Sequence, residues 1–292
     1  MYILKINSVA NPVFKHAYKS SATMNNFKIT EIRRFSPIVY TDPCNGTIHD
    51  SRRTTLFKAF DNVSQYMQGL WDDKSDVYRL ANDAEPVIVT AASNNHFPET
   101  IGLFANLNLV LRKMKSNVKV IFYDLGLESK NRKWMKAFCN CEYRQFPFNK
   151  FPEHVKILNG YAFKPLAIMM VLNEYPFAIW MDTSIRFKQV NISQLFEDAR
   201  QMNIIGVEGE IAIARITLPG TFSHFDKQPC KFINLTDIQS GFLIARATPF
   251  VVKNILKPWV ACALLLDCMV PRDGYLPYLF CKKTARCVWR MS

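Results

Sequence analysis

The sequence lacks an apolar run long enough to cross a bilayer. Its best candidate, Pro258–Val270, is too short and contains Asp267, whereas a membrane-spanning helix needs about 20 apolar residues. The first residues, Met1–Asn7, also lack the extended apolar region of a signal peptide or membrane anchor. The sequence therefore predicts no transmembrane segment and, taken literally, no route into the secretory pathway.

A glycine-rich phosphate-binding loop is also absent from the place where a dinucleotide-binding protein carries one. The first clear strand is expected at Pro86–Ala92, and the chain then reads Ser93-Asn94-Asn95-His96. A dinucleotide-binding fold needs glycines at this turn so that the backbone can approach the pyrophosphate. The sequence thus argues against an ordinary Rossmann dehydrogenase.

Nucleic-acid binding is not indicated either, although the formal net charge is +13, from 37 Lys and Arg against 24 Asp and Glu. The basic residues are scattered in small groups on expected helix faces and loops, where solvated charge is the usual explanation. No stripe of basic residues interleaved with aromatics accompanies them. We expect no nucleic-acid partner, while a nucleotide diphosphate is an anionic ligand that this charge would suit.

The cysteine pattern lacks the spacing of a zinc site, both at Cys139-Asn140-Cys141 and at Cys281…Cys287. The cysteines number eight, and their loop-like surroundings allow disulfides whose pairing stays open: Cys44, Cys139, Cys141, Cys230, Cys262, Cys268, Cys281 and Cys287. Four glycosylation sequons, about twice the number expected by chance, begin at Asn45, Asn62, Asn191 and Asn234. Both features favour a secretory protein, against the expectation from the N-terminus.

Length and composition predict one large domain with an appendage. With 292 residues and 49% hydrophobic content, the chain can bury a substantial core. The strand at Pro86–Ala92, an apolar helix stripe from Leu103 to Met114 and a strand at Val118–Tyr123 form one βαβ unit. We predict an α/β fold with a mainly parallel central sheet flanked by helices at 85–271. An irregular, partly helical extension is expected at 1–84 and a cysteine-rich basic tail at 272–292.

Outside this unit the pattern predicts four further features. Apolar spacing indicates a helix through Thr55–Trp71, and Phe250–Leu266 is expected to form a helix bent by its proline. A strand at Ile204–Val207 is expected to lead into a glycine-containing loop, Gly206…Gly209. The stretch Leu218–Pro229 loses periodicity and is predicted to be a loop that lies near the ligand site.

The stretch Tyr161–Phe187 is the most informative part of the chain. Phe163–Leu172 fits a largely buried helix, and Phe177–Met181 fits a strand buried on both faces, as in a parallel sheet. Asp182-Thr183-Ser184 follows at the carboxyl end of this strand, where open α/β sheets bind ligands. Two interpretations stay open: a polar turn that ends the strand, or a site for Mg²⁺ or Mn²⁺.

The segment Ile179–Phe187, with Lys164-Pro165 before it, resembles nucleotide-sugar glycosyltransferases of the glycosyltransferase-A fold. It is more closely similar to a family of uncharacterised glycosyltransferase-like proteins expanded in nematodes. Five segments expected for that family occur in order: Thr90-Ala91-Ala92-Ser93-Asn94-Asn95-His96-Phe97, Tyr123-Asp124-Leu125-Gly126-Leu127, Lys164-Pro165, Trp180–Phe187 and Gln239-Ser240-Gly241-Phe242. The resemblance implies transfer of a sugar from a nucleotide diphosphate sugar donor to a glycan or glycoprotein acceptor.

The resemblance also implies how the donor phosphates are held. A divalent metal, Mn or Mg, would bridge Asp182 and the diphosphate, with Ser184 assisting. Lys164, at the start of its helix, and Arg186 would contact the phosphates. The alternative for Lys164 is a solvent-facing or salt-bridged lysine, and Arg186 has Asp182 as an alternative partner.

By the same resemblance, the loop after the first strand and the end of the second strand would cradle a nucleotide base and ribose. The residues concerned are Ala91, Ser93, Asn94 and Asp124. Their alternative role is ordinary capping, because Ser and Asn often precede helices and Asp often ends strands.

A turn at Gln239-Ser240-Gly241-Phe242 is implied to receive the acceptor sugar. Gly241 would supply space, and Gln239 and Asp237 polar groups. Asp237 is the candidate base if the reaction inverts configuration. The structural alternative is that Gly241 merely permits a bulge in a strand.

The chain departs from the resembled family at its C-terminal end. It ends at Arg290-Met291-Ser292, whereas the resembled proteins continue into a His/Arg-Tyr-Asp-Gln-Ser element. The resemblance therefore implies that a metal-binding histidine from this region is missing. A non-catalytic relative that acts as a binding or interaction module is therefore the second hypothesis. The resemblance implies a Golgi or ER lumen location, for which this sequence shows no signal peptide or anchor.

Overall fold

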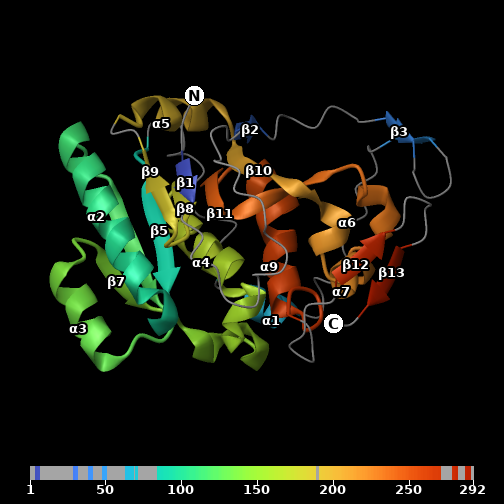
Figure 1. Ribbon diagram of the computed structural model, residues 1–292, viewed down its shortest axis with the longest axis horizontal. Coiled ribbons are helices and arrows are strands. Elements are labelled where there is room, and N and C mark those ends of the chain that lie inside the picture. Colours follow the sequence, from blue (N-terminus) through green and yellow to red (C-terminus); the bar gives the residue numbers. More distant parts are fainter. Residues whose placement is uncertain are drawn as a thin grey trace.

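The computed structural model describes residues 63–68, 70–71, 84–188 and 191–270, and elsewhere the backbone of six short strands. Its centre is a seven-stranded mixed sheet in the order β2-β10-β11-β8-β5-β6-β7 (Figure 1). The strands of this sheet are β2 (Ile29–Glu31), β5 (Val87–Ala92), β6 (Lys119–Asp124), β7 (Glu142–Gln145), β8 (Phe177–Met181), β10 (Ile204–Ala212) and β11 (Thr236–Arg246).

Strand direction confirms the predicted α/β fold class. β5 pairs in parallel with β6 and β8, and β6 pairs in parallel with β7. β11 is antiparallel to both β8 and β10, so β10 runs in the same direction as β8. β2 is antiparallel to β10 at the edge. Four adjacent parallel strands thus end at one edge of the sheet, where the sequence predicted a site.

Each face of the sheet is covered by helices that bury a separate core cluster. One face carries α2 (Phe97–Met114), α3 (Ser129–Phe138) and α5 (Ser193–Gln201), and the other carries α4 (Phe163–Leu172) and α9 (Lys257–Leu264). In Figure 1, α2 and α3 lie at the left and α4 and α9 nearer the centre. Helices on both faces explain why β5 and β8 are buried along their whole length.

Helix α4 begins and ends at the residues that the sequence predicts. It is apolar around its whole circumference, which is typical of a helix enclosed by the protein. Its first turn contains the buried Lys164, the one charged side chain of the helix. A buried ammonium group needs a partner, and that partner lies at the end of β8.

Two expectations were wrong in detail, and a third was confirmed with added detail. Gly206 and Gly209 lie inside β10, not in a loop, because β10 continues to Ala212 through two register shifts against β11. The predicted loop at 218–229 contains α7 (Pro219–His224), which begins with a proline at a position where the missing amide is harmless. The helix predicted at 250–266 is present as a continuous stretch made of α8 (Pro249–Val251), a π-helix at Val252–Leu256 and α9.

The chain ends lie largely outside the described residues. Of the helix predicted at 55–71, the structure describes α1 (Ser64–Met67), and residues 55–62 fall outside the description, as does most of 1–84 and of the tail 272–292. The division at residues 84 and 271 stays a prediction. Backbone pairs join β1 (Leu4–Ile6) to β9 (Ile185–Phe187), β3 (Val39–Thr41) to β4 (Ile48–Asp50), and β12 (Tyr278–Cys281) to β13 (Cys287–Arg290).

Short elements complete the described part. These are α6 (Ile213–Ile216) and 3-10 turns at Asn94–His96, Phe148–Lys150, Glu153–Lys156, Leu158–Gly160 and Pro229–Phe232. Across the described helices, none has both the length and the apolar character needed to cross a membrane.

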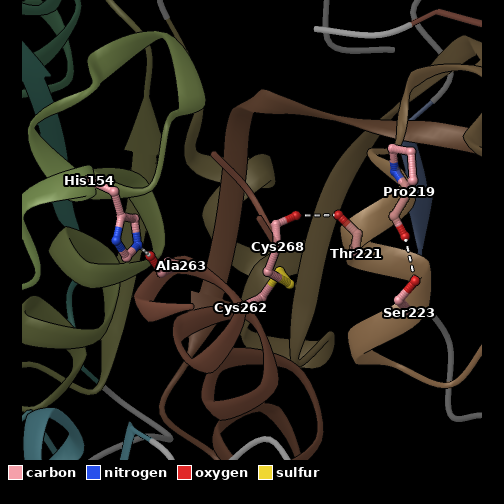
Figure 2. The surroundings of a disulfide bond; sticks show 7 residues. All are labelled: His154, Pro219, Thr221, Ser223, Cys262, Ala263 and Cys268. Atoms are coloured by element: carbon pink, nitrogen blue, oxygen red, sulfur yellow. Dashed lines mark hydrogen bonds between the residues drawn. A yellow bond between two sulfur atoms is a disulfide. The ribbon is translucent and has the colours of Figure 1, made fainter. Parts of the chain in front are cut away.

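Two disulfides are present among the described cysteines, Cys139–Cys141 and Cys262–Cys268. Figure 2 shows the second one, which joins α9 to the turn that follows it. Thr221 of α7 donates its hydroxyl to the carbonyl of Cys268, and His154 Nε2 lies 2.9 Å from the carbonyl of Ala263. The disulfide therefore stands where three separate segments meet.

Candidate functional site

Asp182 lies one residue beyond β8, and its position is fixed by backbone and side-chain hydrogen bonds. Its amide donates to the carbonyl of Gly241 at 2.8 Å, which continues the β8–β11 ladder by one step. Its Oδ1 accepts from Trp180 Nε1 at 2.8 Å, and its Oδ2 accepts from Lys164 Nζ at 2.7 Å. The carboxylate is thus pre-oriented, while 29% of the side chain stays exposed.

Lys164 forms the inner part of the site. Its side chain is only 4% exposed, so its ammonium has been withdrawn from water. Besides Asp182, it donates to Ser240 Oγ at 3.3 Å and to the Ser240 carbonyl at 3.5 Å. The lysine is therefore salt-bridged, with Ser240 as an additional partner that the sequence did not indicate, and its contact with a phosphate stays a prediction.

Tyr161 covers the ammonium of Lys164, which lies 4.6 Å from the centroid of its ring. The residue is held in the left-handed region at φ 55°, an uncommon conformation for an aromatic residue. Its ring is half exposed. Partial burial of the phenol and the negative charge of Asp182 raise the pKa of Tyr161. This aromatic residue was missed by the sequence interpretation, which used it only as the start of a segment.

The two residues after Asp182 face different surroundings. Thr183 is buried and donates its hydroxyl to Glu99 Oε2 at 3.1 Å, which ties the loop to the first turn of α2. Glu99 also contacts His96 Nδ1 at 3.1 Å. Ser184 is half-buried, and within the described part of the chain its hydroxyl has no hydrogen-bond partner. Only Ser184 of the pair thus keeps a hydroxyl available for a ligand.

Arg186 is directed to backbone carbonyl groups, not to Asp182. Its guanidinium donates to the carbonyls of Thr183 and Ile185 at 2.5 and 2.7 Å and to that of Glu99 at 2.7 Å. Burial lowers the pKa of Arg186, and the charge of Glu99 opposes this shift. The arrangement braces the loop after β8 against α2, and direct phosphate contact by Arg186 stays a prediction without geometric support.

Asp124, at the end of β6, is fully buried and bonded by protein donors. It accepts from the amides of Gly126 and Leu127, from Arg132 Nε at 2.9 Å, and from the phenol of Tyr143. Burial alone would raise the pKa of Asp124, but these hydrogen bonds outweigh it and lower the pKa. Asp124 therefore fixes the loop after β6, and its contact with a nucleotide stays a prediction.

The loop after β5 is joined to that same loop. Asn94 donates to Glu128 Oε1 at 2.7 Å and accepts from Asn131 Nδ2 at 2.7 Å. Ser93 donates to Asn95, also in this loop. Ala91 lies within β5, paired with Tyr123 of β6. The structure thus brings the predicted nucleotide-contact residues to the carboxyl ends of two adjacent strands.

The three candidates on β11 separate into two places. Gly241 contacts Asp182, and a Cβ at this glycine would lie 3.5 Å from Asp182 Oδ2. Asp237 lies against Gly209, where an added Cβ would overlap its carboxylate, and it accepts from the amide of Ile211 at 3.1 Å. Gln239 is half exposed and paired with Val207. Of the three, Gly241 is the one that the structure places at Asp182.

The donor set around Asp182 does not fit the predicted divalent cation. Both carboxylate oxygens already accept hydrogen bonds, and one of their donors is an ammonium cation. Elsewhere in the residues that the structure describes, no three His, Cys, Asp or Glu side chains gather as metal ligands would. A divalent cation on Asp182 and Ser184 would stand next to the positive charge of Lys164, which disfavours it.

A groove of about 350 Å³ lies away from Asp182, bounded by residues that include Tyr123, Arg144, Met170 and Glu174. Arg144 donates to both carboxylate oxygens of Glu174, at 2.7 and 2.8 Å. The guanidinium charge is therefore already neutralised, and none of the predicted site residues lines the groove. The polar groups around Asp182 remain the better candidate site.

Comparison with protein families finds one match, at residues 40–169, to a family described as a protein of unknown function (DUF1647). The matched region is less than half of the chain and includes the strands β5 and β6 and the first part of α4. Comparison with curated proteins finds no match.

Several solved glycosyltransferases resemble the fold at low identity. The bifunctional glycosyltransferase WbbM matches with 15% identity over 64% of this chain and 36% of its own, at a TM-score of 0.41. The galactosyltransferase LgtC, in complex with donor and acceptor sugar analogues, matches with 15% identity over 59% of this chain and 63% of its own, at a TM-score of 0.34. Core-mannan synthase A from Aspergillus fumigatus, in an Mn/GDP form, matches with 11% identity over 82% of this chain and 77% of its own, at a TM-score of 0.37. The first two matches span less than two thirds of those chains, and with all three scores below 0.5 the functional proposal depends on this chain's own residues.

Proposed function

We propose that this chain is a glycosyltransferase that moves a sugar from a nucleotide diphosphate sugar to a glycan or glycoprotein acceptor. The observation that carries the proposal is the placement of Asp182, held in one orientation at the carboxyl end of β8 by Trp180, Lys164 and Gly241. This is the edge at which open α/β sheets bind ligands. Membership of the nematode-expanded glycosyltransferase-like family belongs to the same proposal.

In this proposal each part of the site contacts a different part of the substrates. The loops after β5 and β6, fixed by Asn94 and Asp124, receive the nucleotide. The ammonium of Lys164 attracts the diphosphate, and Gly241 leaves the side of Asp182 open to a sugar. During transfer an acceptor oxygen bonds to the anomeric carbon as the bond from that carbon to the diphosphate breaks. Asp237 stays the candidate base for an inverting reaction, and its carboxylate lies against Gly209 of β10 and not beside Asp182.

The structural setting also bears on the compartment. Disulfides such as Cys139–Cys141 and Cys262–Cys268 persist in oxidising compartments. Asn191 and Asn234 of the sequons are exposed among the described residues, as glycan attachment requires. A Golgi or ER lumen location is part of this proposal.

Turnover of nucleotide sugars tests the proposal. We expect the folded protein to hydrolyse or transfer one nucleotide diphosphate sugar, and Asp182→Asn to lower kcat/KM by about a hundredfold, as loss of a pre-oriented charge does. Asp198→Asn is the matched control, because the half-buried Asp198 lies on α5, outside the proposed site, and accepts a hydrogen bond from Gln194. Absence of turnover for every donor, in a protein that still binds nucleotide, would favour the non-catalytic binding module instead.

A further inference from the structure

A cation that neutralises a bound diphosphate would be expected next to Asp182. In this protein the ammonium of Lys164 occupies that position. Lys164 Nζ lies 2.7 Å from Asp182 Oδ2, and the lysine side chain is 4% exposed. Its other neighbours are two oxygens of Ser240 and the ring of Tyr161, all arranged around the ammonium. A cation so enclosed is a fixed part of the site, because it cannot return to water without breaking all of these contacts.

The remaining oxygen donors of the segment are not arranged for a metal. Thr183 follows Asp182, and its hydroxyl is bound to Glu99. The other oxygen of Asp182 is bound to the indole of Trp180. Magnesium and manganese sites use several oxygen ligands, and this segment offers only Ser184 as a further uncommitted side chain.

From this arrangement we infer that the ammonium of Lys164 replaces a divalent cation at Asp182, so that the chain binds a nucleoside diphosphate without metal. The inference rests on the proposed function and names how that site neutralises its ligand. Because the N–H groups of Lys164 are directed at Asp182 and Ser240, its ammonium lowers the energy of a nearby diphosphate anion through its charge. The negative charge of Asp182 keeps the lysine in place before the ligand arrives.

Binding of UDP, GDP, CDP and ADP, each measured by calorimetry in EDTA and again in Mn²⁺, tests the inference on the wild-type chain. We expect one nucleotide to bind with the same Kd, within about threefold, in both conditions. Manganese alone, followed by the loss of its free electron paramagnetic resonance signal, should show no stoichiometric binding. Binding that requires Mn²⁺ would overturn the inference and leave the proposed function intact. Failure of all four nucleotides in both conditions would overturn both.

Variants of Lys164 give a second test. Lys164→Met keeps most of the buried stem and removes the charge, and we expect nucleotide affinity to fall by about tenfold or more, without recovery in Mn²⁺. Lys164→Arg keeps a cation at this position, so we expect it to bind nucleotide more tightly than Lys164→Met. This difference separates the loss of charge from an effect on folding. Lys156→Met is the control, because Lys156 is exposed and paired with Glu153. Recovery of Lys164→Met by Mn²⁺ would contradict the inference.

Discussion

The phenol of Tyr143, on β7, donates a hydrogen bond to the carboxylate of Asp124, at the end of the neighbouring strand β6. The two residues join adjacent parallel strands at the edge where the candidate site lies. Asp124 in turn accepts from the amides of Gly126 and Leu127. The pair therefore sets the shape of a loop that the proposal assigns to the nucleotide.

Tyr143→Phe should lower the free energy of unfolding by about 1.5 kcal/mol, since it removes a hydrogen bond to a buried charged group. Chemical denaturation of the two proteins measures the difference. Tyr175→Phe serves as the control, because Tyr175 bonds to an exposed lysine, Lys119. Its effect should stay within about 0.5 kcal/mol. Equal losses of unfolding free energy for the two variants would show that the Tyr143–Asp124 hydrogen bond stabilises the protein no more than an exposed one.

The same pair predicts an alkaline transition. Burial, the hydrogen bond to Asp124 and the charge of Asp124 raise the pKa of Tyr143 to about 12. Because the folded pKa lies above the unfolded value of about 10, the stabilising contribution is complete below pH 10 and is lost as pH rises through about 12. A difference titration of tyrosinate absorbance between the wild type and Tyr143→Phe isolates this group. A midpoint near the ordinary tyrosine value would contradict the prediction.

Gly241→Ala should separate stability from activity. The new Cβ would lie 3.5 Å from Asp182 Oδ2 and 3.7 Å from Ile185 Cδ1, which are ordinary contact distances. We expect an unchanged melting temperature, but about tenfold lower turnover, because the methyl group occupies the open side of the carboxylate.

Gly220→Ala is the contrasting control. A Cβ there would overlap the backbone carbonyl of Asp267, so we expect a loss of about 2 kcal/mol or more in the free energy of unfolding. Unchanged turnover in Gly241→Ala would remove Gly241 from the proposed acceptor path.

Local pattern was sufficient to predict the parts of the fold that depend on neighbouring residues. The bounds of α4 and β8 follow from continuous apolar runs ended by polar residues and a proline. The pattern failed where pairing between distant segments decides structure. β10 continues through its glycines because β11 offers a partner with shifted register, which no local signal reveals.

The same distinction applies to the site. Asp182 could be predicted because a continuous apolar run marks the strand before it. Gly241 could be predicted because its segment matches one expected for the resembled family. The contact of Thr183 with Glu99 joins residues 84 positions apart, and no spacing in the sequence indicates it. The partners of Arg186 were also hidden from the sequence. A charge next to a candidate ligand site suggests a phosphate contact, which stays a prediction, and the structure adds its backbone carbonyl partners in the β8 loop and α2.

The central claim is that the edge of the sheet around Asp182 binds a nucleotide diphosphate. Thermal unfolding of the purified chain with a panel of nucleoside diphosphates tests it most directly, because a ligand that binds only the folded state must raise the melting temperature. The account predicts a shift with one nucleotide that is lost in Asp182→Asn but kept in Asp198→Asn. No shift with any nucleotide, in a sample that unfolds cooperatively, would contradict it.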